Sequence, residues 1–203
     1  MFCGLCGIVL FLQHYYEQMP RRLIRKQYRK ARYVLYRETL IDSKEHLLTF
    51  IGSFVGIGII GFLNSHYLVA NDNFYLIGSF GASSVLIYGI INSPLAQPRN
   101  LIGGHLICAI IGVSVQKLIG SEPWLACALA VSLSIVVMQI TKTLHPPGGA
   151  TALIAVIGSE KIKALGYLYV LSPVLTGVVI LFLVAMVFNN LRHRKYPHRG
   201  MFK

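Results

Sequence analysis

Acidic side chains are scarce in this sequence. Seven Asp and Glu residues stand against nineteen Lys and Arg residues, and the formal net charge is +12. Every acid lies in a terminus or in a short connection, and none lies inside a long apolar run. A basic side chain inside one of those runs would lack an acidic protein partner, which favours an anionic ligand.

Motifs for redox, metal and ATP chemistry are also missing or weak. Cys3 and Cys6 form a Cys-x-x-Cys pair, but no second pair and no histidines in metal-ligand spacing accompany it, so two ordinary thiols are favoured over a zinc or redox site. Cys108 and Cys127 fall inside apolar runs and are expected to act as small apolar side chains. The sequence contains no ATP-binding motif, so a pump would need a partner chain. We expect no metal, no cofactor and no catalytic residue.

Long apolar runs, in contrast, dominate the chain. The composition is 55% apolar and 13% charged, and the mean hydropathy is +0.62. A helix that spans a bilayer needs about 20 mainly apolar residues. Four runs are close to this length, at 47–69, 101–119, 124–140 and 167–188, and two shorter or broken runs lie at 74–91 and 146–158. The sequence therefore predicts an all-α polytopic membrane protein with about six membrane segments, four full spans and two broken or half-helix segments.

Basic residues cluster at both ends of the apolar region. By the positive-inside rule both termini are expected in the cytoplasm, so the number of crossings is even. Four spans with two re-entrant segments, or six crossings, both satisfy this rule, and we favour six because they place Arg99 and Lys142 on the cytoplasmic side. The basic ends are better explained by topology and by contacts with anionic lipid than by nucleic acid.

Three regions follow from this pattern. We expect a basic cytoplasmic segment with a surface helix at 1–46, a transmembrane domain at 47–190 and a basic cytoplasmic tail at 191–203, in a multi-pass protein of the cell inner membrane. Gly52 and Gly56 have the spacing that lets two helices approach closely, and the contact is either within one subunit or between subunits. A homo-oligomer is expected, because about six short crossings are few to shield a polar site and its access paths.

Two stretches of small residues occupy matching positions. An offset of 68 residues places 81–87 beneath 149–155, which aligns two small-residue helix starts, each followed by apolar helix. Each half of the chain then contains a span, a broken segment and a span, at 47–119 and 124–188. Two halves of three crossings each must be inserted in opposite directions, an arrangement that many transporters use to build a site near the membrane midplane. The sequence therefore predicts two inverted repeats.

The polar, helix-breaking stretch at 139–158 is the strongest candidate for a site. His145 precedes a proline, which disfavours helical backbone there, and Pro146 and Pro147 favour a first helical turn. A helix is therefore expected from about residue 147 to 157. The amide groups of residues 148–151 would be free to hold an anion at its positive end. The alternative is that the small residues only allow close packing of helices.

Several polar side chains near the broken segments have two interpretations. His105 and His145 either couple protons or bind substrate, or they make structural hydrogen bonds to neighbouring helices. Arg99 is either a cytoplasmic anchor or a cation that balances an anion in the membrane. Lys142 either extends to the interface or shares a helix face with His145.

Three segments in a fixed order resemble a known family. They are Leu-His-Pro-Pro-Gly-Gly-Ala-Thr-Ala at 144–152, Gly-Ser-Phe-Gly-Ala-Ser-Ser-Val-Leu at 78–86 and Ser-Pro-Leu-Ala-Gln-Pro-Arg-Asn-Leu-Ile-Gly-Gly-His at 93–105. The chain resembles, over about residues 47–188, the HPP family of integral membrane proteins, named for its His-Pro-Pro motif. Members in plastids and cyanobacteria are associated with nitrite transport. The resemblance therefore implies a transporter or channel for a small inorganic anion, with nitrite as the first candidate.

The residues expected to bind the anion come from these motifs. They are Gly81, Ala82, Ser83, Ser84, Gln97, Arg99, Asn100, His105, Lys142, His145, Pro146, Pro147, Gly148, Gly149, Ala150 and Thr151. Two alternatives are a scaffold or sensor anchored in the membrane and an intramembrane enzyme that uses the two histidines. The sequence offers that enzyme no evident nucleophile and no acidic partner for either ring.

Overall fold

Helices make up all the regular structure in the part of the chain that the computed structural model describes, residues 43–67, 78–191 and 194–198. The surface helix expected within 1–46 and the Cys3–Cys6 pair fall outside these residues, except for the last four positions of 1–46. Those four belong to the first described helix, α3 (Ser43–Tyr67). The all-helical fold class predicted from the sequence is confirmed for the described residues.

The described elements are four long helices and several shorter ones. In chain order they are α3 (Ser43–Tyr67), α4 (Gly78–Ser84), the π-helix η1 (Val85–Gly89), the 3-10 helix η2 (Pro94–Ala96), α5 (Pro98–Ile119), α6 (Pro123–Ile140), α7 (Pro146–Ile157), α8 (Glu160–Ala164), the π-helix η3 (Val170–Leu175) and α9 (Thr176–Asn189). Prolines occupy the first turns of α5, α6 and α7, where the missing amide hydrogen has no helical partner to lose.

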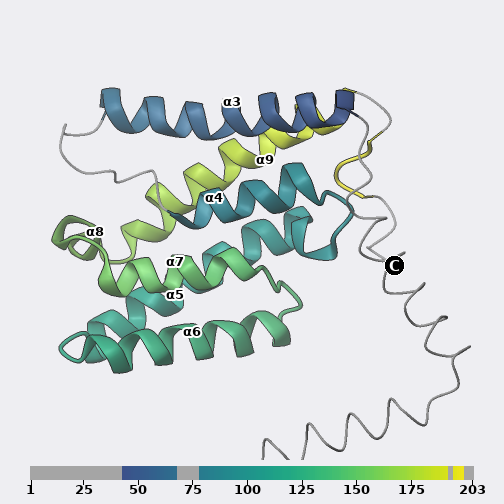
Figure 1. The fold of residues 1–203 in the computed structure, drawn as a ribbon. Coiled ribbons are helices and arrows are strands. Elements are labelled where there is room, and N and C mark those ends of the chain that lie inside the picture. The colour runs from purple at the N-terminus through teal and green to yellow at the C-terminus, as the bar shows by residue number, and fades with distance from the viewer. Residues whose placement is uncertain (1–42, 68–77, 192–193, 199–203) are drawn as a thin grey trace, which may run out of the picture. The chain divides into compact units, whose positions relative to one another are not determined.

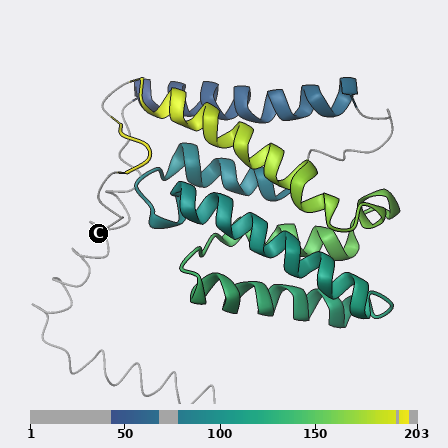
Figure 2. The same cartoon turned by 180° about the vertical axis from the view of Figure 1, so that it is seen from behind.

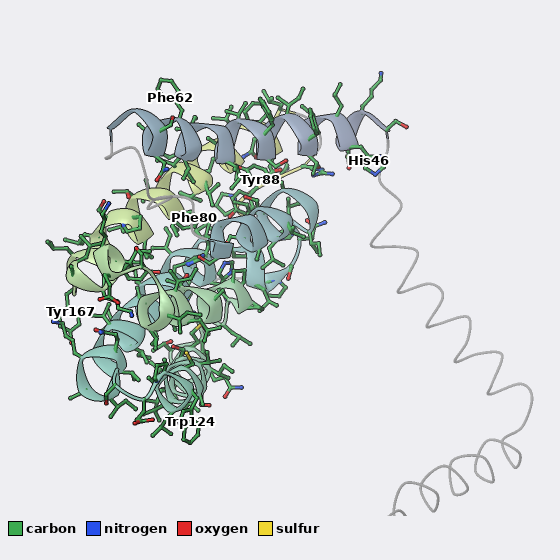
Figure 3. All side chains as sticks on the ribbon, turned by 60° about the vertical axis from the view of Figure 1, so that its left-hand side comes forward. His46, Phe62, Phe80, Tyr88, Trp124 and Tyr167 are labelled. Carbon is green, nitrogen blue, oxygen red and sulfur yellow. The ribbon has the colours of Figure 1, made fainter. Side chains whose placement is uncertain are left out.

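Four of these helices are long and apolar enough to cross a membrane. They are Ser43–Ser65, Pro98–Ile119, Pro123–Ile140 and Val170–Asn189, which confirms the four predicted spans to within a few residues. Figures 1 and 2 show α3 on one side of the bundle and α6 on the opposite side, with the other helices between them. Phe62 and Trp124 on these two outer helices are exposed, whereas Phe80 and Tyr88 lie inside the bundle (Figure 3). The outer surfaces are therefore suited to lipid.

The two predicted broken segments are short helices in the structure. The first combines the seven residues of α4 with the π-turn η1, and the second is α7, whose twelve residues extend about 18 Å. A third break, which the sequence analysis did not predict, lies in the last span at Ser172, where the backbone is extended (φ −137°, ψ 119°) before Pro173. The order of long, short and long segments matches the two predicted halves, and their inverted relation stays a prediction.

The two glycines of the first span serve packing within the subunit. A Cβ on Gly52 would lie 3.1 Å from the Tyr88 ring, and one on Gly56 would lie 2.5 Å from the Tyr88 hydroxyl oxygen. Tyr88 donates from that hydroxyl to the carbonyl of Leu181 on α9, at 3.2 Å. The Gly52 and Gly56 positions therefore let α3 close over Tyr88, which favours the intrasubunit interpretation of their spacing.

Residues 194–198 hydrogen-bond to the start of α3 and to η2 at one end of the bundle. Arg194 binds the Glu45 carboxylate through Nε and Nη2, at 3.1 and 3.0 Å, and donates from Nη1 to the Tyr88 carbonyl at 3.1 Å. Tyr196 is buried and donates to the Ala96 carbonyl at 2.8 Å, and burial raises the pKa of its hydroxyl, which therefore stays protonated. The start of α3, the η2 turn and residues 194–198 thus lie at the same end of the molecule.

Candidate functional site

A serine bridges the two histidines inside the bundle. Ser83 Oγ lies 2.8 Å from His105 Nε2 and 2.9 Å from His145 Nε2, and the ring centroids of the two histidines are 5.0 Å apart. All three residues are fully buried, with 0% exposure. The Phe80 ring (Figure 3) contacts His105 edge-on, with centroids 5.9 Å apart. Three helices therefore meet at one hydroxyl group.

Local chemistry places each of these side chains. His145 has extended backbone (φ −141°, ψ 102°) because Pro146 follows it, and this conformation makes it the N-terminal cap of α7. His105 lies seven residues after Pro98 on α5, or about 10 Å along the helix axis. The midpoint of α5 is between residues 108 and 109, about 5 Å further on. The histidine pair therefore lies near the middle of a membrane-spanning helix.

The bridge continues through hydrogen bonds at both ends. His105 Nδ1 is 2.7 Å from Thr151 Oγ1, and Thr151 Oγ1 donates to Ser79 Oγ at 2.9 Å. At the other end, His145 Nδ1 is 2.8 Å from the carbonyl oxygen of Leu95 in η2. We call Ser79, Ser83, His105, His145 and Thr151 the buried polar network, and each of its members has 0% exposure.

Glycines allow the helices of the network to approach. A Cβ on Gly104 would lie 2.5 Å from His145 Cβ, and one on Gly148 would lie 2.8 Å from Cys108 Sγ and 3.0 Å from the Gly104 carbonyl oxygen. A Cβ on Gly112, two turns further along α5, would lie 2.7 Å from the Ala152 carbonyl oxygen. Only glycine fits these contacts between α5 and α7, so close packing and the network occur together in this helix pair.

Four of the predicted binding residues belong to the network, namely Ser83, His105, His145 and Thr151. Pro147 and Gly148 are buried beside it, Gly149 and Ala150 are half-buried, and Pro146 is exposed. Ser84 is buried and its hydroxyl has no hydrogen-bond partner. Gly81 and Ala82 are exposed on the other face of α4.

The remaining predicted residues lie at the end of the bundle. Gln97 is buried and donates to the Ile91 and Ser93 carbonyls, so it holds the η2 loop. Asn100 donates to the Leu144 carbonyl at 2.7 Å and so fixes the residue before His145. The side chains of Arg99 and Lys142 are exposed, and Arg99 donates to the Thr141 carbonyl at 2.7 Å. These two cations lie outside the buried polar network.

The prediction of two open amide cradles needs correction. Helix α4 already includes Gly78, so Ala82, Ser83 and Ser84 lie beyond the first helical turn, where their amide groups bond to the helix itself. In α7 the two prolines have no amide hydrogen, and the Gly148 amide donates to the His145 carbonyl at 2.9 Å. The amides of Ala150 and Thr151 lie within the helix. The polar groups of this site are therefore side chains and not bare amides.

Sequence reasoning missed Ser79, the Leu95 carbonyl and Tyr169. Tyr169 donates from its hydroxyl to the Thr151 carbonyl at 3.1 Å, so it holds α7 from the last span. Ser79 carried a usable signal, because it precedes Ser83 by four residues and the two share a helix face. The Leu95 carbonyl had no such signal, since any residue supplies a carbonyl.

The site consists of hydroxyl groups and imidazole rings that hydrogen-bond to one another. Within the described residues no group of three or more His, Cys, Asp or Glu side chains could hold a metal ion. Two described carboxylates are paired elsewhere, Glu45 with Arg194 and Glu160 with Lys163. The network can therefore donate hydrogen bonds, accept them and carry protons.

These helices define a multi-pass α-helical membrane protein with a polar site inside it. The family model described as "HPP, transmembrane region" matches residues 38–197. The chain belongs to the HPP family. This match agrees with the resemblance seen at 47–188 and extends it at both ends.

Two curated relatives are transmembrane proteins of Dictyostelium discoideum. One is 44% identical over 160 residues, which are 77% of this chain and 51% of the relative. The other is 44% identical over 165 residues, which are 79% of this chain and 58% of the relative. The chain thus spans just over half the length of each of these relatives. No solved structure matches the chain.

Proposed function

We propose that this protein is a transporter or channel for a small inorganic anion. The observation that carries the proposal is the buried polar network, five polar side chains near the middle of a membrane-spanning helix. Polar side chains inside a membrane protein are costly and usually mark a pathway for a substrate or proton. The residues hydrogen-bonded in the network include no carboxylate, so it suits an anion better than a cation.

The network would bind the anion by replacing hydrogen bonds among its own side chains with hydrogen bonds to the anion. Hydroxyl groups of Ser83 and Thr151 and the ring nitrogens of the histidines bond to one another when the site is closed. An anion would accept these donors in place of part of its hydration shell. The N-terminal end of α7, at His145, adds the positive end of a helix dipole. Arg99 and Lys142, exposed at the same end, would attract anions toward it.

Nitrite is the first candidate substrate, through the resemblance stated above. The start of α3 and residues 194–198 lie at the same end of the bundle, and we propose that this end faces the cytoplasm because basic residues flank the apolar region of the sequence. The assignment to the cell inner membrane stays a prediction. We also propose a homo-oligomer, for which the exposed small residues Gly81 and Ala82 on α4 offer a face for close packing.

Reconstituted protein provides the test. Proteoliposomes would be assayed for uptake of nitrite, nitrate, formate, chloride and phosphate against protein-free vesicles. We expect uptake of at least one of these anions, and we expect Ser83→Ala to lower its initial rate at least tenfold. Ser134→Ala, which removes a fully buried hydroxyl on α6 outside the network, should stay within about twofold of the unmodified protein. Uptake of none of the five anions, or uptake unaffected by Ser83→Ala, would contradict the proposal.

An intramembrane hydrolase is the second candidate, and one observation favours it. Ser83 Oγ is bonded to His145 Nε2, and His145 Nδ1 is held by a carbonyl oxygen, a geometry that can activate a serine nucleophile. Full burial of Ser83 argues against it, because a nucleophile must reach its substrate. Labelling by a fluorophosphonate probe, lost in Ser83→Ala but kept in Ser134→Ala, would establish the hydrolase. We expect no labelling at Ser83.

A further inference from the structure

The hydrogen bonds of the buried polar network limit how many protons it can hold. A carbonyl oxygen can only accept, so His145 Nδ1 must carry a hydrogen to donate to Leu95. In a neutral His145 ring the second nitrogen, Nε2, would then be an acceptor. When Thr151 donates its single hydroxyl hydrogen to Ser79, His105 Nδ1 must in turn donate to Thr151.

These assignments leave the Nε2 atoms of the two histidines and the hydroxyl hydrogen of Ser83 still to be paired. If both rings were neutral, His105 Nε2 and His145 Nε2 would both be acceptors, and Ser83 has one hydrogen to give. One of the two bonds would then join two acceptors. All bonds are satisfied when one of the rings carries a hydrogen on Nε2 as well and donates it to Ser83. This arrangement of hydrogens therefore holds one proton more than two neutral imidazoles.

The same heavy atoms also accommodate the network without that proton. Ser83 then donates to His145 Nε2, His105 donates from Nε2 to Ser83, and Thr151 turns its hydroxyl to donate to His105 Nδ1. Every ring nitrogen keeps a partner, and the hydrogens in the two arrangements differ by one. Gain of a proton thus requires hydrogen movements and rotation of the Thr151 hydroxyl, and no movement of helices.

A second extra proton does not fit this network. Both rings would then present an Nε2–H to the single Ser83 oxygen, with ring centroids 5.0 Å apart in a fully buried site. Two like charges at this separation with no acidic partner would repel strongly. The network is therefore limited to one proton.

Among the residues that the structure describes, no charged side chain contacts the two rings. Around the network, α4 contributes Ser79, Ser83 and Phe80, and the last span contributes Tyr169, which donates to the Thr151 carbonyl. The thiol of Cys108 on α5 is packed against Gly148. The cations of the adjoining loops, Arg99 and Lys142, are exposed, and Glu122 is exposed at the opposite end of α5. A proton on the network would therefore be uncompensated until an anion enters.

We propose that the buried polar network binds one proton and that this proton crosses the membrane together with one anion. This inference rests on the proposed function and names its coupling ion. The proton adds a charge of +1 to the network and the anion adds −1, so the loaded site is neutral. The empty site without the extra proton and the site loaded with both ions then each carry no net charge through the membrane interior, which lowers the cost of carrying an anion there.

The proton count can be measured without any transport assay. Protein labelled with ¹⁵N-histidine would be studied in liposomes by solid-state NMR, with the two network rings identified as those whose signals Ser83→Ala shifts and Ser134→Ala does not. At high pH we expect one ring protonated on Nδ1, His145, and the other on Nε2, His105. On acidification one proton should enter the pair. Two rings with the same neutral tautomer, or uptake of two protons or none between pH 8 and pH 4, would overturn the inference.

The coupling is measured in proteoliposomes with controlled gradients. With one proton per anion, a gradient of one pH unit should support a tenfold accumulation of the anion, and an imposed membrane potential should change the accumulation less than twofold. Protein-free vesicles control for passive diffusion of nitrous acid, and nitrate provides an anion of a strong acid. Accumulation that follows the potential and not the pH gradient would overturn the coupling and leave anion transport standing. Absence of uptake of all five anions would instead overturn the proposed function.

Substitutions of Thr151 test whether its hydroxyl group is needed for the coupled transport. Thr151→Ser keeps the hydroxyl group and should keep the tenfold accumulation per pH unit, whereas Thr151→Val leaves His105 Nδ1 without a donor or acceptor and should abolish it. Gel filtration would show whether the Thr151→Val protein folds. A folded Thr151→Val protein that still supports tenfold accumulation of the anion would contradict the relay.

Discussion

At the scale of single residues, the main feature is a serine hydroxyl shared by two buried imidazoles. A buried donor or acceptor that loses its partner costs about 1–3 kcal/mol. Ser83 is bonded to both rings, and each ring has one further partner, Thr151 or the Leu95 carbonyl. The network is therefore fully satisfied only when all its members are present, and it couples residues that are up to 72 positions apart.

Loss of the Thr151 hydroxyl is expected to reduce stability. Thr151→Val keeps the shape of the side chain but leaves His105 Nδ1 and Ser79 Oγ without this partner, so we expect a loss of about 1–3 kcal/mol in the free energy of unfolding. Thr151→Ser keeps the hydroxyl group and removes a methyl group, which should cost about 1 kcal/mol. Denaturation in detergent measures both. A smaller loss for valine than for serine would show that the hydroxyl does not stabilise the fold.

At the scale of elements, α5 and α7 approach each other closely at two glycines. Gly112 lies against the backbone of Ala152, and Gly104 lies against His145. Membrane helices gain stability from such close approach through van der Waals contact, because lipid tails are as apolar as the side chains they replace. The position of the two histidines therefore depends on small residues on both helices.

Gly112 on α5 and Gly149 on α7 allow a matched pair of substitutions, because one is closely packed and the other is not. Gly112→Ala would place a Cβ 2.7 Å from the Ala152 carbonyl oxygen, a backbone atom that cannot turn away, and we expect destabilisation by about 1–3 kcal/mol. Gly149→Ala meets no atom within 4 Å and should be neutral or stabilise by up to about 1 kcal/mol, since alanine favours helix. Thermal unfolding in detergent compares the two. Equal melting temperatures would contradict the close packing.

Sequence reasoning was most successful where the local chemistry is restrictive. Pro146 and Pro147 allow few conformations, and the helix predicted from about residue 147 begins at Pro146. Gly81 is permissive, and the helix start predicted there was wrong by at least three residues. Partners across the bundle could not be predicted, because the bond between Ser83 and His145 depends on how α4 packs against α7. The break at Ser172 was missed because the apolar run around it resembles an uninterrupted span.

At the scale of the whole molecule, the contacts of residues 194–198 bear on how many times the chain crosses the membrane. These residues bind Glu45 at the start of α3, and they also bind Ala96 and Gln97 just before α5. Arg99 and Asn100 then bind the loop between α6 and α7 at Thr141 and Leu144. Four chain segments thus meet at one end of the bundle. This arrangement favours the six predicted segments, which stay a prediction, because four spans with two re-entrant segments would place Arg99 and Lys142 at the end opposite to residues 194–198.

The ion pair at this end is expected to contribute to stability. The Arg194 side chain is 10% exposed and binds the Glu45 carboxylate and the Tyr88 carbonyl together. Arg194→Ala leaves both without this donor, and we expect a loss of about 1–3 kcal/mol in the free energy of unfolding. Exchange of the two charges, Glu45→Arg with Arg194→Glu, should recover part of the loss seen in either single variant. A double variant that is as unstable as the sum of the single variants would show that the pair does not interact.

The six-segment arrangement makes a prediction about sidedness in the membrane. Single cysteines would replace Lys142, Glu122 and Lys195, all exposed, in a protein whose four native cysteines are changed to alanine. An impermeant maleimide added to sealed, uniformly oriented vesicles should label positions 142 and 195 from the same side and position 122 from the other. This follows because Lys142 lies in the loop that Arg99 and Asn100 bind, next to the residues that contact the tail, whereas Glu122 lies one 22-residue helix away. Labelling of positions 142 and 195 from opposite sides would contradict the six-segment arrangement and support the four-crossing alternative.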